Sequence, residues 1–441
     1  MTKPYQSSTD YILKSVEVTG DNGVVINCAN LIAQLEIFEN LERPFLTGKM
    51  MMRDDVNFID GISFNGTERC KIVLEQPLSN GISIELNFIL RKLDAVRKTN
   101  DQTEVMSITL LEENAFNSQL RKISKSFSGS PDEIIEKIMT EIGQSVDLPA
   151  IKPAQSGSIK YLVPYLTAFQ AADTVKNRTS TENGLPYFLF KTISDKNIQL
   201  KSLEEMMTTP PWNQNKPYRY SKAYSAQALN LTQEEASYIV ENFSYAAKDD
   251  TMSLIEAGSV SAVVDMIDVT SGVKERFSYN AEEMFQKLYD ANVLEAGYNP
   301  IISTKYANGD LNLVNAPAKN ISRIVMNATY SEYKNLSQEE TSAQFKLDFM
   351  RRAFKNLLFK NSITIRVPGV HYLQGVNRSI GTQIEFYYPN NNAAALEGLG
   401  SDRDLRDRKR SGKYVIYSAR HLFVANKHTV DLTAVKLGNE K

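Results

Sequence analysis

Between residues 10 and 115 the sequence repeats one pattern, in which apolar and polar side chains alternate over short stretches bounded by turn residues. Alternation with period two is typical of a strand that buries one face. No segment between the stretches is long enough for a helical crossover, so we expect antiparallel neighbours. The pattern therefore predicts a barrel or a sandwich. Its clearest members are Leu46, Gly48, Met50 and Met52, then Ile84, Leu86, Phe88 and Leu90, with turns at Asp21-Asn22-Gly23, Asn65-Gly66, Ser79-Asn80-Gly81 and Thr99-Asn100-Asp101.

A helical period begins near residue 116. Ser130-Pro131-Asp132-Glu133 combines a capping box with proline at the first helical position. Ile134, Ile138 and Ile142 then fall on one helical face. A second helix is predicted from about Tyr165, followed by a strand pair over residues 186–203. These elements predict a small α/β domain.

Strand patterns return in the last hundred residues, after a helix predicted over about 336–360. The final segment, Ser411–Gly438, has the pattern of a β-hairpin that turns at Ala425-Asn426-Lys427. We expect one side of this hairpin to carry Tyr414, Ile416, Leu422 and Val424, and after the turn Val430, Leu432 and Ala434.

The chain of 441 residues is long enough for about three domains. We predict a mixed, mainly β protein with two similar antiparallel β-barrels, a small α/β domain between them and a further inserted domain. The expected ranges are 1–116 for the first barrel, 117–205 for the α/β domain, 206–250 with 346–441 for the second barrel, and 251–345 for the insertion.

Composition excludes several classes of protein. An apolar fraction of 42% supplies packed cores, while a net charge of −2 lacks the cationic excess of a general nucleic-acid binder. Cys28 and Cys70 are too few for a disulfide framework and are expected to be buried in a reducing compartment. No stretch has the roughly 20 apolar residues of a membrane span, and the N-terminus does not resemble a signal peptide. We expect synthesis in the cytoplasm and no membrane anchoring.

The sequence offers few residues for catalysis. It has three histidines, no Gly-x-Ser-x-Gly motif and no phosphate-binding glycine loop. His421 and His428 lie seven residues apart across a turn, without the further ligands that a metal site requires. We expect His421 to be a half-exposed histidine on a sheet and not a ligand, and we expect the same of His371, which follows Pro368-Gly369-Val370 in a loop. The sequence therefore predicts no catalytic residues, no metal and no cofactor.

One ordered set of segments resembles a known family. Leu35–Glu75 runs from a strand through Arg43-Pro44-Phe45 into a second strand. It is similar to the first tube-type barrel of the central hub proteins of contractile phage tails. Ser362–Phe386 and the closing hairpin are similar to the second barrel. The family includes the T-even-type baseplate hub, the late-control D proteins and the N-terminal part of VgrG-type spikes. The positions that carry the resemblance, all with expected structural roles, are Arg43, Pro44, Phe45, Gly48, Asp54, Gly66, Pro368, Gly369, Gly375 and His421.

The resemblance implies a structural virion protein without enzymatic activity. It implies a homotrimer whose six barrels form a pseudo-sixfold ring around a DNA channel, adapting the hexameric tail tube to a trimeric central spike. The expected partners are the spike, the tube protein and other baseplate proteins, and DNA would pass without specific binding.

An alternative is a tail protein that binds or degrades carbohydrate. Its basis is the abundance of tyrosine and the single tryptophan, Trp212, which could stack on a sugar. Core packing explains most of these aromatic residues equally well.

Overall fold

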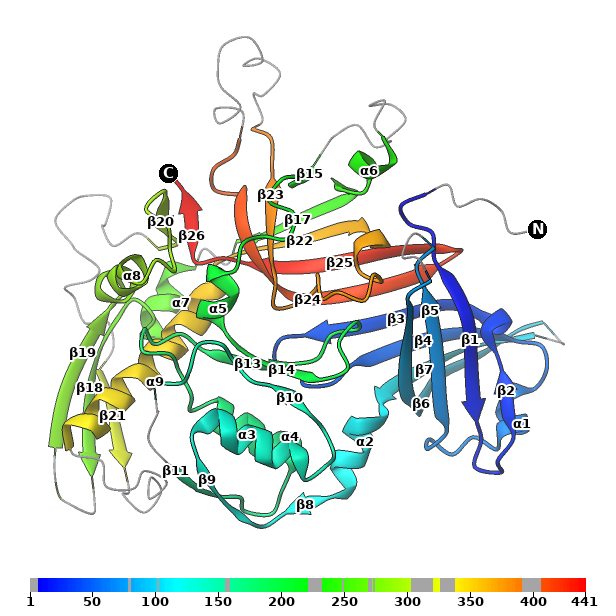
Figure 1. Cartoon of the computed structure of the whole chain (residues 1–441), viewed down its shortest axis with the longest axis horizontal. Helices are drawn as coiled ribbons and strands as arrows, with labels where there is room; N and C mark the ends of the chain where they lie inside the picture. The colour runs from blue at the N-terminus through cyan, green and yellow to red at the C-terminus, as the bar shows by residue number, and fades with distance from the viewer. Residues whose placement is uncertain are drawn as a thin grey trace, which may run out of the picture.

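The computed structural model describes residues 7–77, 81–100, 103–154, 159–220, 232–247, 250–268, 272, 274–302, 320–325, 338–390 and 406–441. Strands of two barrels occupy the centre and right of Figure 1, and helices cover the left and lower sides. The turn residues expected at 79–80 and 101 lie outside the described residues.

The first barrel is a curled antiparallel sheet with the strand order β3-β4-β7-β6-β5-β1-β2. This confirms the strand pattern and the antiparallel pairing predicted from residues 10–115. Leu35, Met50 and Phe88 are buried in its core. The strands are β1 (Ile12–Thr19), β2 (Val25–Asn27), β3 (Ile32–Asn40), β4 (Thr47–Asp54), β5 (Arg69–Glu75), β6 (Ser83–Asn100) and β7 (Thr103–Glu112), and the short helix α1 (Phe58–Ile62) follows β4.

The C-terminal hairpin, β24 (Gly412–Val424) and β25 (Lys427–Val435), closes the gap between β3 and β1. Residues 418–424 of β24 pair with β3. On the other side, Asp10 forms a bridge with Lys427, and the backbone N–H of His428 donates to the carbonyl of Thr9 at 2.6 Å. The last strands of the chain therefore complete the first barrel.

The second barrel is built around the same hairpin. Its ring runs β23-β24-β25-β22-β17, and β15 and β16 complete it. The antiparallel pattern holds except at β15, which pairs parallel with both β16 and β23. Long connections precede and follow β15, and such connections permit parallel neighbours. The strands are β15 (Tyr218–Tyr220), β16 (Ile239–Val240), β17 (Asn242–Ala247), β22 (Asn361–Pro368) and β23 (Gln383–Tyr387).

The α/β domain lies below the barrels in Figure 1. The predicted capping box is present at Ser130 and Glu133, and a second one at Thr167 and Gln170 starts the next helix. The predicted strand pair is antiparallel and buried. The elements are α2 (Glu113–Leu120), β8 (Lys122–Ile123), β9 (Ser126–Gly129), α3 (Pro131–Thr140), β10 (Val146–Asp147), β11 (Ile159–Leu162), β12 (Leu166–Thr167), α4 (Ala168–Lys176), β13 (Tyr187–Phe190), β14 (Ile198–Ser202) and α5 (Leu203–Thr208).

A small sheet, β19-β18-β21, lies on the left in Figure 1 with helix α9 across it. Phe349 of α9 contacts the rings of Phe277 and Tyr279, so the helix predicted near 336–360 is present and packs here. The predicted domain boundaries stay a prediction. The remaining elements are α6 (Gln233–Ala236), α7 (Thr251–Glu256), β18 (Ser261–Asp268), β19 (Lys274–Asn280), α8 (Ala281–Asp290), β20 (Tyr298–Pro300), β21 (Asn320–Val325), α9 (Gln338–Leu358) and β26 (Gly438–Glu440).

A β-bulge divides β24 into two halves. Ile416 pairs with Ala434, but Ser418 pairs with Thr433, so Tyr417 is the extra residue. A bulge inserts one residue and reverses the alternation beyond it. The predicted hairpin exists, but its predicted faces are wrong after Tyr417. Ala419, His421 and Phe423 turn inward, whereas Leu422 and Val424 are only half-buried.

The bulge lies where β24 changes partner. Before it, residues 412–415 pair with β23, and after it residues 418–424 pair with β3. Ile416 accordingly lies in the core of the second barrel and Phe423 in that of the first. One antiparallel sheet, β17-β22-β25-β24-β3-β4-β7-β6, thus crosses both barrels without interruption.

Deleting Tyr417 should destabilise the junction between the barrels and the helices. The deletion would remove the bulge but keep Ile416 opposite Ala434 and Ser418 opposite Thr433, so the inward residues of β24 would stay inward. The contacts of Tyr417 with the rings of Phe188 and Phe359 and with Glu42 would be lost. We expect a cooperative thermal transition by circular dichroism, several degrees below that of the wild type. The control Tyr417→Phe keeps the bulge and the ring contacts and loses only the hydrogen bond from the hydroxyl to Glu42, at a cost of about 1 kcal/mol. A deletion variant that melts close to the wild type would contradict this role for the bulge residue.

Candidate functional site

The outer face of the shared sheet carries a row of paired charges, which we call the ladder: Arg366, Asp431, Arg420 and Glu36. Arg366 binds Asp431 in a bidentate arrangement, with Nε–Oδ1 at 2.6 Å and Nη2–Oδ2 at 2.9 Å. Arg420 lies 3.5 Å from the same carboxylate and is bidentate to Glu36, with N–O distances of 2.7 and 3.2 Å. The ladder thus joins β22, β25, β24 and β3. Each arginine already binds a carboxylate in the geometry that guanidinium groups use to bind phosphate.

The polar face continues across the first barrel. Lys49 of β4 stands opposite Glu36, and Thr109 of β7 stands opposite Lys49. The Thr109 hydroxyl donates to Asp94, which also pairs with Lys92 at 3.1 Å. These hydrogen bonds, led by the one from Thr109, lower the pKa of Asp94 below its usual value. The other side of the same strands packs into the two cores. The inward face of the sheet is therefore apolar, and the outward face is mainly polar, with Phe38, Met51 and Leu422 among its charged and hydroxyl groups.

All three histidines are buried, so the expectation of half-exposed histidines is wrong. His421 is 0% exposed because the bulge turns it inward, beneath the ladder. Its Nδ1 lies 3.2 Å from Nε2 of His428, and its Nε2 lies 3.4 Å from Oε2 of Glu39. Glu39 also accepts hydrogen bonds from the backbone N–H of Ile193 and from the hydroxyl of Ser379. This buried group joins β3, β24 and β25 to the loop after β13 and the loop before β23.

The environment of His428 keeps its ring neutral and fixed. Burial, with a smaller contribution from His421, holds the pKa of His428 well below its usual value. The ring stacks on Phe423 with centroids 4.3 Å apart. It also covers Gly369, where an added Cβ would lie 2.1 Å from Nδ1 of His428. Only glycine fits at that position.

The buried histidines do not form a metal centre. Within the described ranges, no group of three His, Cys, Asp or Glu side chains is arranged to hold a metal ion. His371 lies apart from the pair and contacts the Ser237 hydroxyl at 2.9 Å through Nε2. Burial lowers the pKa of His371 to about 4.

A second polar group connects the bulge to the helices. Glu42, in the β3–β4 loop, binds Lys176 of α4 at 3.0 Å and Lys355 of α9 at 2.8 Å, and the hydroxyl of Tyr417 donates to it at 3.2 Å. Burial raises the pKa of the Glu42 carboxyl, but pairing with Lys176 and Lys355 outweighs burial, and the net pKa is below the usual value. Burial also lowers the pKa of Lys355.

The positions that carried the sequence resemblance fall into separate places in the structure. Gly369 and His421 meet at the buried histidine pair, and Pro368 precedes them at the end of β22. Gly48 lies under the ladder, where an added Cβ would be 2.9 Å from the carbonyl of Glu36. Gly375 contacts Ile82 of the first barrel with a φ of +73°.

The other positions shape turns at the edges of the first barrel. Asp54 accepts from the backbone N–H groups of Val56 and Phe58 at 2.9 and 2.7 Å and so fixes the turn into α1. Gly66 has a φ of +94°. Arg43 is exposed, Pro44 is half-buried, and Phe45 packs on Phe169 of α4 at 5.5 Å.

Sequence reasoning missed the acidic residues of these groups: Glu36, Glu39, Glu42 and Asp431. Glu36 and Asp431 stand at outward positions of strand patterns, which is a usable signal, but their partners depend on strand register. Glu39 gives no signal at all, because a carboxylate at an inward strand position contradicts the alternation that identifies the strand.

Two cavities lie beside the barrels. A cleft of about 560 Å³ lies between β6 and the loop at residues 191–196. Its charged lining residues are largely paired, Lys191 with Glu112, Glu113 with Arg69 and Glu85 with Lys71. The second cavity, of about 40 Å³, lies between the second barrel and the helices.

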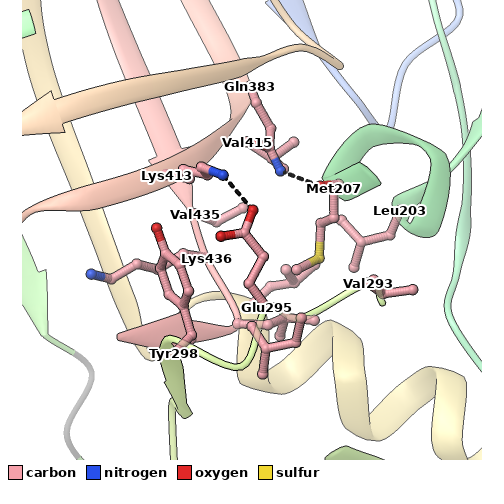
Figure 2. A pocket seen from close by; sticks show the side chains of 14 residues that line it. Leu203, Met207, Val293, Glu295, Tyr298, Gln383, Lys413, Val415, Val435 and Lys436 are labelled. Carbon is pink, nitrogen blue, oxygen red and sulfur yellow. Dashed lines mark hydrogen bonds and ion pairs between the residues drawn. The ribbon is translucent and has the colours of Figure 1, made fainter. Parts of the chain in front are cut away.

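Figure 2 shows this smaller cavity with α5 on one side and β24 on the other. Lys413 crosses to Glu295 at 2.5 Å, and the Gln383 amide donates to the carbonyl of Met207 at 2.8 Å. Mostly apolar residues make up the rest of its wall. The cavity has room for little more than water, so it marks the contact between parts of the fold.

Trp212, the basis of the carbohydrate alternative, is packed among other rings. Tyr218 and Tyr372 meet it edge-on at 5.8 and 6.3 Å, and His371 lies 5.3 Å away. The guanidinium of Arg378 lies over the indole at 5.4 Å. A sugar would have to displace these groups before it could stack on the indole.

Acid should destabilise the protein through His371. In the unfolded chain a histidine binds a proton near pH 6.5, whereas the native pKa is about 4, so stability is lost as pH falls from 6.5 through 4. Between pH 7.5 and pH 4, the free energy of unfolding of the variant His371→Gln should fall by roughly 3 kcal/mol less than that of the wild type. Urea unfolding at pH 7.5 and pH 4 at one protein concentration measures the difference. An equal loss in both proteins would contradict the buried, neutral state of His371.

Neither a protein-family model nor a curated protein matches the sequence. Solved structures do match its shape. A tail protein from Neisseria meningitidis MC58 is 12% identical with a TM-score of 0.52, and the match covers 97% of each chain. The 43 kDa tail protein of prophage MuSo2 from Shewanella oneidensis is 10% identical with a TM-score of 0.52, covering 96% of this chain and 98% of that one. The chain therefore has the fold of these tail proteins, which confirms at the level of the fold the resemblance found in its sequence.

Proposed function

We propose that this protein is a structural component of a contractile tail, the central hub of its baseplate. Three copies would form a ring of six barrels that adapts the sixfold tail tube to a threefold central spike. The observation that carries this proposal is the shared strand β24. This strand joins the two barrels, so that one polar face of the sheet spans both. Two barrels held in a fixed relation with a common face can form part of the inner wall of a ring.

The ladder suits a channel through which DNA passes. DNA binding needs cationic side chains that neutralise phosphates and release the counterions bound there. Arg366 and Arg420 already bind Asp431 and Glu36, so the face presents polar groups with little net attraction for phosphate. In this proposal the ladder face lines the channel, and the helices of the α/β and inserted domains lie outside, near other baseplate proteins.

The protein acts in this role without catalysis. The cleft beside β6 holds charges that are mostly paired with each other, and the histidines are buried in packing. Localisation would be the tail baseplate of the virion, after synthesis in the host cytoplasm. The carbohydrate alternative is weaker because the Trp212 indole is already covered by other side chains.

Light scattering tests the assembly state. At tens of micromolar we expect a species of three times the chain mass of 49.6 kDa for the protein alone, or that mass plus the mass of the bound spike when the spike protein is present. A chain that stays monomeric in both conditions would contradict the proposed hub.

Neutralising the ladder acids should create DNA binding. In Glu36→Gln combined with Asp431→Asn, the released Arg366 and Arg420 become available to phosphate. We expect retention on duplex DNA at low salt that declines steeply with salt, measured by fluorescence anisotropy, and no retention of the wild type. Glu136→Gln with Asp290→Asn changes the net charge equally at exposed positions elsewhere and should leave binding absent. Equal binding by both double variants would show that net charge, not the ladder, matters.

A further inference from the structure

Two exposed surfaces lie at opposite ends of the strand order, which runs from β16 and β15 at one end to β1 and β2 at the other. The first, here called the tip, is at the free end of the first barrel. The second, here called the rim, is at the free end of the second barrel. In Figure 1 the tip lies at the lower right, around β2 and α1, and the rim at the top, around β15 and β23. The tip comprises Asp21, Val24, Val25, Asp55, Val56 and Asp60, and the rim comprises Arg219, Tyr387, Tyr388, Arg406, Arg408 and Arg410.

The tip combines exposed valines with exposed carboxylates. Val56, Val25 and Val24 are 60, 59 and 44% exposed, which is unusual for valine. The turn between β1 and β2 packs on α1, where the Asn22 amide donates to the carbonyl of Gly61 at 3.3 Å. The valines of both segments therefore belong to one surface.

The carboxylates of the tip are available to a partner. Asp21, Asp55 and Asp60 are exposed, and none lies within ion-pair distance of a cation in the described part of the chain. Asp54, beside them, is occupied in holding the turn into α1.

The rim consists of arginines stacked on tyrosines. Tyr387 has the guanidinium groups of Arg219 and Arg406 at 6.0 and 5.3 Å from its ring. Arg410 lies 5.2 Å from the ring of Tyr388. Stacking holds the planar guanidinium groups in place while leaving their N–H edges able to donate.

The rim has more arginines than neighbouring carboxylates among the described residues. Arg406 and Arg410 have carboxylate neighbours in Glu385 and Asp407, at 3.9 and 3.1 Å. Arg219 and Arg408 have none within ion-pair distance among the described residues. Fixed arginines and tyrosines are the residue types most enriched at energetically important protein contacts.

We propose that the tip of one copy docks on the rim of the next copy, and that three such contacts close the ring. This inference rests on the proposed hub function and specifies how it assembles. A contact between two different surfaces of one chain is head-to-tail, and it closes into a ring when the rotation between copies is right. The tip supplies the acids and exposed valines, and the rim supplies arginine donors that are held in place on tyrosine rings. The tip belongs to the first barrel and the rim to the second, so each contact would join the first barrel of one copy to the second barrel of the next.

Charge reversal tests the contact. The pair Asp55→Lys and Asp60→Lys places cations of the tip against the arginines of the rim. The pair Arg219→Glu and Arg408→Glu places carboxylates of the rim against the carboxylates of the tip. Each pair should raise the concentration for half-assembly about a hundredfold, because like charges meet at every contact. Combining all four substitutions in one chain restores opposite charges and should restore the trimer. Sedimentation velocity at several concentrations measures the species, and circular dichroism checks that each variant is folded.

The control is Glu136→Lys, which replaces an exposed acid on α3 by lysine, as each substitution of the tip does. This variant should leave the trimer intact. A wild-type trimer that survives both reversal pairs would overturn the tip-to-rim contact but leave the hub function standing. So would reversal pairs that each dissociate the trimer without rescue in the combined variant. A wild-type chain that never forms a trimer, alone or with the spike protein, would overturn the hub function itself.

Discussion

The structure depends on a hairpin that two barrels share, and above all on its strand β24. The first half of β24 pairs within the second barrel and the second half pairs within the first, and the bulge at Tyr417 lies where the partner changes. The partner strand β25 has no bulge and keeps Val430, Leu432 and Ala434 buried on one face along its length, so the same face of the sheet is inward in both barrels. The extra residue shifts the alternation of β24 by one, so that Ile416 before the bulge and Ala419, His421 and Phe423 after it lie on that inward face. The two cores therefore lie on one side of a sheet with one continuous outer face.

Buried polar groups hold the junction around this strand. Glu39, His421 and His428 lie on its inner side, and Glu42 with its two lysines lies next to the bulge. Burying such groups costs free energy unless they are paired with donors, acceptors or opposite charges. Few relative positions of the packed elements bring these groups within reach of one another. They therefore stabilise one arrangement of the barrels, the α/β domain and α9 over others. This accounts for histidines and carboxylates at places where an apolar side chain would suffice for packing alone.

A rigid arrangement suits a protein whose proposed work is geometric. In the hub proposal, the relation between the two barrels of one chain must match the relation between barrels of neighbouring chains, or the ring would not close. A shared strand fixes the first relation through continuous backbone hydrogen bonds. In the proposed tip-to-rim contact, the second relation would depend on the fixed arginines of the rim and the exposed carboxylates of the tip.

The sequence by itself determined the local elements. Period-two alternation in residues 10–115, the capping box at Ser130 and the final hairpin are local signals, written in residues close together along the chain, and the structure contains all three. Only the tertiary structure decided which face of the hairpin is buried after Tyr417, that the hairpin belongs to both barrels, and which acids pair with Arg366 and Arg420. These features depend on strand register between segments hundreds of residues apart, and a shift of one residue reverses every side chain. No local pattern records that register, so the ladder and the buried histidines appear only when the sheet is assembled.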